Sequence, residues 1–211
     1  MRIAGAAFLV LVLGVAVAAF VNEQTPSDQP SDPAAEATPV AQAVARPETS
    51  VQAQPVAEAP DQPPILRAAP SLANLDGWLQ SDLASLEELR GSVVIVQFWT
   101  FGCHNCKATL PYLKDIYATY RERGLEIVGV HAPEFRYERD PDAIQAAALE
   151  LGVTWPIALD TSRRDFRAWQ GSPAYWPRTY VVDADGQIRF DHIGEGAYEE
   201  LEQTVAALLA G

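Results

Sequence analysis

The chain has 211 residues, of which 48% are hydrophobic and 20% charged, and its formal net charge is −13. A nucleic-acid-binding domain carries a basic face instead, so this acidic balance argues against that class. The composition changes twice along the chain, which divides it into three parts.

The first part, residues 1–21, is an apolar segment. Arg2 is followed by nineteen uncharged residues, 3–21, which are enough to span a bilayer as a helix. Ala16-Val17-Ala18 resembles a signal-peptide cleavage site, but the apolar run continues beyond it and favours an uncleaved anchor. In both alternatives Arg2 stays in the cytoplasm. We expect a single-pass protein of the bacterial inner membrane facing the periplasm, or a soluble periplasmic protein after cleavage.

The second part, residues 22–70, is rich in proline, alanine and acidic residues. Ten of the sixteen prolines fall here, and the segment has no aromatic residue. Such a composition buries too little apolar surface to offset the entropy of ordering. We expect a disordered linker that separates the membrane segment from a domain.

The third part, residues 71–211, has the size of one domain with its own core. All five tryptophans and all seven tyrosines lie here. Leu75-Asp76-Gly77-Trp78 is typical of a turn, and a short helix is expected from Ser85, where Ser-X-X-Glu forms a capping box. Apolar periodicity and end signals predict the further elements. The first four are a strand at 93–100, a helix to Arg123, a strand at 125–131 and a helix at 141–151. A strand at 154–159, a short helix from Ser162, a hairpin at 180–190 and a final helix around Leu201 follow.

Alternating strands and helices followed by a hairpin and a last helix predict an α/β fold, with a mixed sheet and helices on both faces. The first buried strand ends at Thr100, so Cys103 lies at the carboxyl end of a central strand. Ligands bind open α/β sheets at this edge.

Cys103 and Cys106 are the only cysteines of the chain, and they stand where a strand leads into a helix. Free N–H groups at a helix start stabilise a thiolate, so the first cysteine of such a pair becomes a nucleophile near neutral pH. The second cysteine lies one helical turn away and can close a disulfide with the first. The arrangement predicts a redox-active dithiol that needs no other cofactor.

A cysteine pair can serve three other purposes. A c-type haem site requires a histidine directly after the second cysteine, where this chain has Lys107, so it is excluded. A structural zinc site requires four ligands, and three scattered histidines offer few, so no metal is expected. A structural disulfide over so short a loop would constrain the unfolded chain little.

The chain resembles the thioredoxin superfamily, in its exported TlpA-like branch, and most closely the C-terminal thioredoxin-like domain of DipZ-type proteins. The residues that carry this resemblance are Phe98-Trp99-Thr100 before the cysteine pair, Leu110-Pro111-Tyr112-Leu113, the stretch 129–135, Tyr175-Trp176-Pro177 and Gly194-Glu195-Gly196. The resemblance implies that Pro177 is a cis-proline facing the dithiol, where a substrate strand pairs, and that Trp99 and Trp176 flank the site. It further implies a glutamate, Glu134, as proton acceptor for Cys106.

Two departures from the family matter. Many relatives carry an aspartate six residues before the first cysteine, where this chain has Gln97. DipZ-type proteins are fused to a multi-span membrane domain, whereas this chain has at most one span, so its electrons must come from a separate membrane protein.

We therefore expect a membrane-tethered periplasmic thiol–disulfide oxidoreductase, acting on exported protein thiols or disulfides and favouring reduction. His104 tunes the pKa of Cys103 or competes with Glu134 as proton acceptor. Two alternatives stay open: a copper-binding metallochaperone using the two cysteines and a histidine, and a thiol peroxidase, because Thr100-X-X-Cys103 loosely matches a peroxidase pattern.

Overall fold

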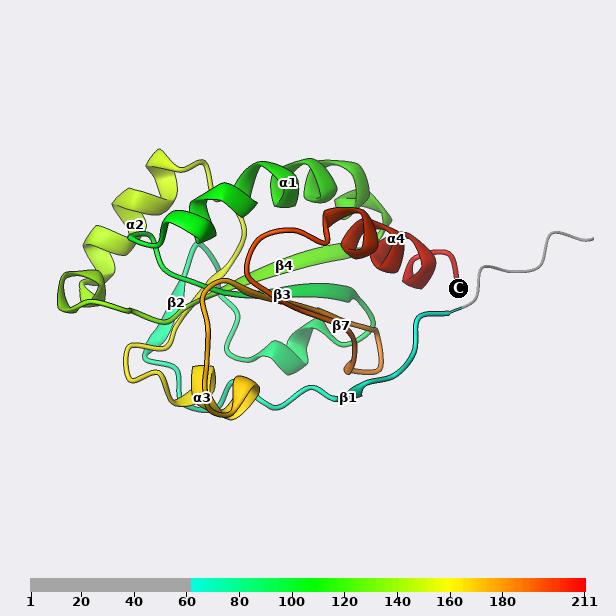
Figure 1. Cartoon of the computed structure of the whole chain (residues 1–211), viewed down its shortest axis with the longest axis horizontal. Helices are drawn as coiled ribbons and strands as arrows, with labels where there is room; N and C mark the ends of the chain where they lie inside the picture. The colour runs from blue at the N-terminus through cyan, green and yellow to red at the C-terminus, as the bar shows by residue number, and fades with distance from the viewer. Residues whose placement is uncertain (1–61) are drawn as a thin grey trace, which may run out of the picture. The chain divides into compact units, whose positions relative to one another are not determined.

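The structure is a computed structural model that describes residues 62–211 (Figure 1). The predictions of a membrane segment at 1–21, and of a linker over most of 22–70, concern residues outside this range. In the described part, no helix is both long enough and apolar enough to cross a membrane.

Seven strands form one mixed sheet in the order β1-β7-β6-β3-β4-β5-β2. Their bounds are β1 Arg67–Ala68, β2 Gly77–Leu79, β3 Val93–Trp99, β4 Leu125–His131, β5 Ile157–Leu159, β6 Arg178–Val182 and β7 Gln187–Ile193. The central strand β3 runs parallel to β4 and antiparallel to β6. The predicted mixed sheet is confirmed.

Helices cover both faces of this sheet. The α-helices are α1 His104–Tyr120, α2 Pro141–Glu150, α3 Arg164–Gln170 and α4 Tyr198–Leu208, and the 3-10 helices are η1 Leu86–Leu89, η2 Arg121–Arg123 and η3 Arg136–Arg139. Figure 1 shows α1, α2 and α4 on one side of the strands and α3 on the other. Two separate apolar clusters correspond to these two faces.

The central strands are mostly apolar because both of their faces are covered. In β3 every residue is buried. Ile95 packs into the cluster that holds the apolar residues of α1, and the next residue, Val96, packs with Phe166 of α3. This alternation fixes which side chains of β3 lie beneath the start of α1.

The end signals read from the sequence act as expected. Gly124 takes a φ angle of 101° after η2, a left-handed conformation that glycine adopts without steric cost. The Asp140 carboxylate accepts the N–H of Asp142 and caps α2, whose first residue is Pro141. At the hairpin between β6 and β7, Gly186 has a φ angle of 79°.

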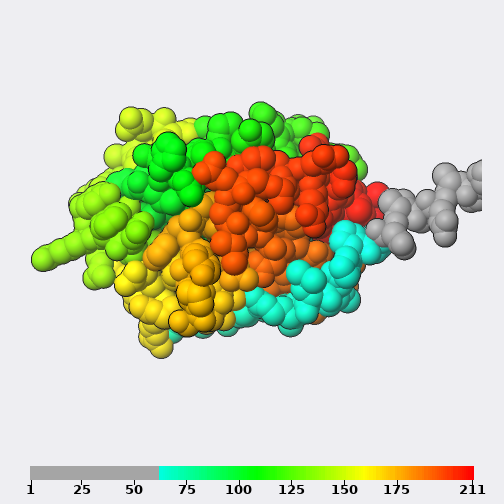
Figure 2. Space-filling view, in the orientation of Figure 1, coloured from blue at the N-terminus to red at the C-terminus, as the bar shows by residue number. Residues whose placement is uncertain are grey.

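Two edge strands correct the sequence prediction. Gly77 and Trp78 were predicted as part of a turn, but Gly77–Leu79 pairs antiparallel with β5. Arg67–Ala68, predicted as linker, pairs with β7, and Leu66 and Ala69 extend this contact through backbone hydrogen bonds. Figure 2 shows this N-terminal stretch (cyan) lying along the orange surface. The folded part therefore begins before residue 71, because the open edge of β7 offers hydrogen-bond partners that composition does not reveal.

Candidate active site

Cys103 lies at the boundary between the turn after β3 and helix α1. We call residues 100–103 the redox turn; it closes through a 3.2 Å hydrogen bond from the N–H of Cys103 to the Thr100 carbonyl. Cys103 is extended and serves as the N-cap of α1, and its Sγ accepts the N–H of Cys106 at 3.2 Å. A cysteine here occupies the position in which side-chain oxygens usually cap helices.

This position lowers the pKa of the Cys103 thiol from its ordinary value of 9.0 to about 7. The largest cause is a hydrogen bond from the Cys106 thiol, and the N–H groups of Cys106 and Asn105 act in the same direction. Partial burial and the negative charge of Glu134 oppose them. Cys103 therefore exists in large part as a thiolate at neutral pH, the form that attacks disulfides.

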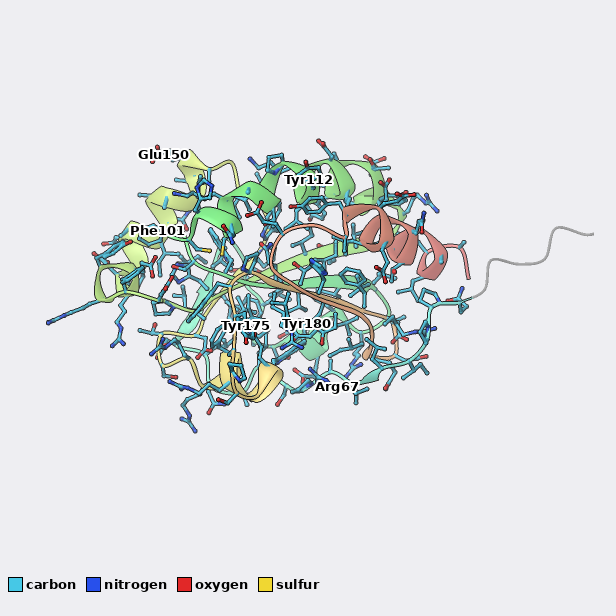
Figure 3. All side chains as sticks on the ribbon, in the orientation of Figure 1. Arg67, Phe101, Tyr112, Glu150, Tyr175 and Tyr180 are labelled. Carbon is cyan, nitrogen blue, oxygen red and sulfur yellow. The ribbon has the colours of Figure 1, made fainter. Side chains whose placement is uncertain are left out.

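Cys106 has the opposite properties. It is fully buried, and burial, together with the hydrogen bond to Cys103 and the charge on that sulfur, raises its pKa. Both cysteines are free thiols in this structure. Figure 3 shows the labelled Phe101, a residue of the redox turn, near the start of α1. The site thus combines one partly exposed, acidic thiol with one buried thiol that stays protonated.

Gln97 of β3 stands where the resemblance implied an aspartate. Its amide nitrogen donates to Thr109 Oγ1 at 2.8 Å, and the Thr109 hydroxyl donates to the Cys106 carbonyl at 2.7 Å. Gln97 therefore supports the first turn of α1 through Thr109. A side-chain amide does not accept a proton near neutral pH, so Gln97 cannot act as a base for Cys106.

A buried carboxylate does reach the site, from a residue that the sequence did not single out. Glu138 of η3 is 0% exposed, and its Oε1 accepts the N–H of Gly102 at 3.0 Å. Its Oε2 accepts the N–H groups of Glu134 and Phe135 at 2.7 and 2.8 Å. The charge of Glu138 also contributes to the raised pKa of Cys106.

The two predicted proton-transfer residues, Glu134 and His104, are both exposed. Glu134 follows β4 at the expected edge, and its charge acts on Cys103, whereas the carboxylate that acts on Cys106 is that of Glu138. His104 is the first residue of α1. Their roles as proton acceptor or as pKa-tuning residue stay predictions.

Aromatic side chains line the inner side of the redox turn. Trp99 is 1% exposed and belongs to the same core cluster as Cys106. Its predicted role in substrate binding stays a prediction. The Phe101 ring stacks on the ring of His131, with centroids 5.7 Å apart. Burial lowers the pKa of His131 to about 4, so this imidazole is neutral at pH 7.

Trp176 and Pro177 directly precede β6. The Trp176–Pro177 peptide bond is cis, as the resemblance implied. The indole of Trp176 donates to the Ala132 carbonyl at 2.8 Å and stacks on Phe166 with centroids 4.2 Å apart. This hydrogen bond connects Trp176 to Ala132, the residue that directly follows β4. The substrate-binding role of these two residues stays a prediction.

Comparisons with known proteins agree with this geometry. Residues 65–191 match the model of the AhpC/TSA family. The chain is 37% identical over 144 residues to DipZ of Mycobacterium tuberculosis, which is 67% of this chain but 20% of DipZ. It is 29% identical to the thiol-disulfide oxidoreductase YkuV of Bacillus subtilis, over 67% of this chain and 93% of YkuV.

The fold also matches solved structures. A thioredoxin-like protein in its oxidised form superimposes with a TM-score of 0.60 at 30% identity, over 68% of this chain and 95% of that protein. The family match spans more than half of the chain, and the dithiol lies within it. This chain therefore belongs to the AhpC/TSA family and has a thioredoxin-like fold.

Proposed function

We propose that the chain is a membrane-tethered, exported thiol–disulfide reductase that uses Cys103 as nucleophile and Cys106 as resolving thiol. The observation that carries the proposal is the difference between the two sulfurs. Cys103 is partly exposed with a pKa of about 7, while Cys106 is buried with a raised pKa. A reductase needs this asymmetry, because one thiol must attack the substrate disulfide while the other stays protonated until the mixed disulfide has formed.

The reaction proceeds in two exchanges. The Cys103 thiolate attacks one sulfur of a substrate disulfide, which forms a mixed disulfide and releases the other substrate sulfur as a thiolate. Cys106 then loses its proton and attacks Cys103 Sγ, which releases the second substrate thiol and leaves the Cys103–Cys106 disulfide. A separate membrane protein returns the two electrons. Glu134 is our proposed proton acceptor for Cys106, with His104 as its competitor.

The thiol peroxidase alternative receives little support from the redox turn. It rests on Thr100, whose hydroxyl would have to lie beside Cys103. Thr100 is 0% exposed, and its Oγ1 lies 3.2 Å from Nε2 of His131. Rapid consumption of hydroperoxide by the reduced protein would restore this alternative.

The copper-binding alternative needs a third ligand beside the two cysteines. Within residues 62–211, no three His, Cys, Asp or Glu side chains converge in a way that could hold a metal ion. Metal titration of the reduced protein, compared with the Cys103→Ser and Cys106→Ser variants, separates this function from disulfide exchange.

The direction of exchange is tested by equilibrating the dithiol against glutathione. A reductase has a potential well below that of the glutathione pool, whereas a value near that of the strongest disulfide donors would identify an oxidase. The proposed tether is tested separately: the full chain should fractionate with membranes and keep residues 1–21. A soluble exported form beginning near Ala19 would contradict the tether and leave the dithiol chemistry intact.

A further inference from the structure

Glu138 is a buried carboxylate whose bonds join two separate segments. One oxygen contacts the redox turn through the N–H of Gly102, and the other contacts the residues just after β4 through the N–H groups of Glu134 and Phe135. Burying a charge is costly unless hydrogen bonds compensate it. Here three N–H donors do so, and among residues 62–211 no cation forms a salt bridge with it.

The contact with the redox turn is close as well as polar. A Cβ atom added at Gly102 would overlap the carboxylate of Glu138 and lie 2.5 Å from the Tyr137 hydroxyl. Gly102 immediately precedes Cys103, so the carboxylate holds the chain one residue before the nucleophile. Figure 2 shows the yellow-green surface that includes η3 beside the start of α1 (green).

We propose that Glu138 is a positioning residue of the active site: its carboxylate fixes the redox turn against residues 134–139 and thereby holds Cys103 at the N-cap of α1. The thiolate of Cys103 depends on that place, because the N–H groups of Asn105 and Cys106 stabilise it there. The hydrogen bonds of the Glu138 carboxylate go to backbone N–H groups. Glu138 acts through the backbone of Gly102.

Substitution of Glu138 by glutamine distinguishes positioning from a charge effect. The amide oxygen keeps more hydrogen bonds when it accepts from Glu134 and Phe135, which places the amide N–H₂ against the N–H of Gly102. Two donors then face each other, and the redox turn loses the hydrogen bond from the Gly102 N–H to the side chain of residue 138. Loss of a charge alone stabilises the Cys103 thiolate, whereas loss of the N-cap geometry destabilises it. The two explanations therefore predict opposite signs.

The experiment measures the rate at which iodoacetamide alkylates Cys103, as a function of pH, in the reduced full-length protein. In Glu138→Gln we expect the midpoint to rise by about 0.7 pH unit, the equivalent of one lost capping interaction. The matched control is Glu134→Gln, the same chemical change in the same segment. Since the charge of Glu134 raises the pKa of Cys103, that midpoint should fall. Cys106 and His104 are the other titratable groups near Cys103, and both variants retain them.

Gly102→Ala approaches the same contact from the other side. Gly102 does not adopt a left-handed φ angle, so alanine is disfavoured there by its contacts alone. This substitution should raise the midpoint, as Glu138→Gln does. The double variant should shift the midpoint by less than the sum of the two single shifts, because both substitutions break the same contact between Glu138 and Gly102. A midpoint that falls or stays unchanged in Glu138→Gln overturns the proposal, as does additivity of the two shifts.

A measurement on the unmodified protein keeps the test valid if the variants do not fold. The amide proton of Gly102 should exchange roughly a hundredfold more slowly than in an open chain, because a buried carboxylate accepts it. Exchange at the open-chain rate would overturn the proposal. None of these measurements uses a substrate, so they are independent of whether the protein reduces or oxidises its partners.

Discussion

The Sγ atom of Cys103 lies 3.2 Å from the backbone nitrogen of Cys106, whose N–H it accepts. One residue of the pair thus stabilises the charge on the other through its backbone and also through its thiol. The spacing of three residues brings both donors to the same sulfur. The chemistry of the two thiols therefore diverges because of where α1 begins.

Glu134→Gln should make Cys103 more acidic. Removal of a negative charge stabilises the thiolate, so the pKa falls below about 7, and alkylation at pH 6 should become roughly twofold faster. The reduced form gains the same stabilisation, so the reduction potential should rise. Glu200→Gln on α4, another exposed glutamate, serves as the control and should change neither quantity.

The same variant tests the proposed base. If Glu134 accepts the proton of Cys106, turnover of Glu134→Gln should be slower, and its dependence on pH should change even though Cys103 has become more acidic. An unchanged pH–rate profile would remove Glu134 from this step. Loss of the corresponding titration in His104→Ala would transfer the role to His104.

His131 should make stability depend on pH. Its pKa is about 4 in the folded protein and 6.5 in the unfolded chain, so between these values the unfolded state binds more protons. The free energy of unfolding should therefore fall as pH falls from 6.5 to 4, by about 3 kcal/mol as an upper value. Urea unfolding at pH 7 and pH 4.5 measures it. His131→Gln should lose this component, whereas equal pH dependence in both proteins would show that His131 does not cause it.

Removal of residues 62–70 should destabilise the domain. The stretch contributes two backbone hydrogen bonds beside β1, from the N–H of Leu66 to the Ile188 carbonyl of β7 and from the N–H of Ala69 to the Gly186 carbonyl just before β7. The Pro63 carbonyl also accepts a hydrogen bond from the guanidinium of Arg189. Loss of such bonds costs about 1–3 kcal/mol. A protein of residues 71–211 should unfold at lower urea concentration than one of residues 62–211. A protein of residues 65–211, which keeps β1, should lose less, and equal midpoints for all three would place the stretch outside the fold.

The central elements were predictable because their sequences carry strong local signals. β3 and β4 are mostly apolar, and Gly124, Asp140 and Gly186 end or begin elements by their own conformational preferences. The edge strands β1 and β2 carry no such signal. Two or three residues become a strand only because β7 and β5 leave an edge to pair with, which is a tertiary effect.

The site shows the same division. Cys103 and Cys106 were identified by spacing and by their place after a strand. Glu138 was missed because charged residues surround it in the sequence, namely Arg136, Arg139 and Asp140. Such a stretch usually forms a solvated surface. The usable signal was its place three residues after Phe135, the spacing at which a glutamate accepts the N–H at the start of a helix. Phe135 has no side-chain oxygen, so the complete capping pattern was absent.

Trapping of the mixed disulfide tests the central claim, that Cys103 attacks and Cys106 resolves. Cys103→Ser and Cys106→Ser, both reduced, are mixed with a protein disulfide, and covalent adducts are identified by mass spectrometry. Cys106→Ser should accumulate an adduct through Cys103, since its nucleophile remains and nothing releases the partner. Cys103→Ser should accumulate almost none, because Cys106 is buried and protonated. Equal trapping by the two variants would contradict the assignment of roles.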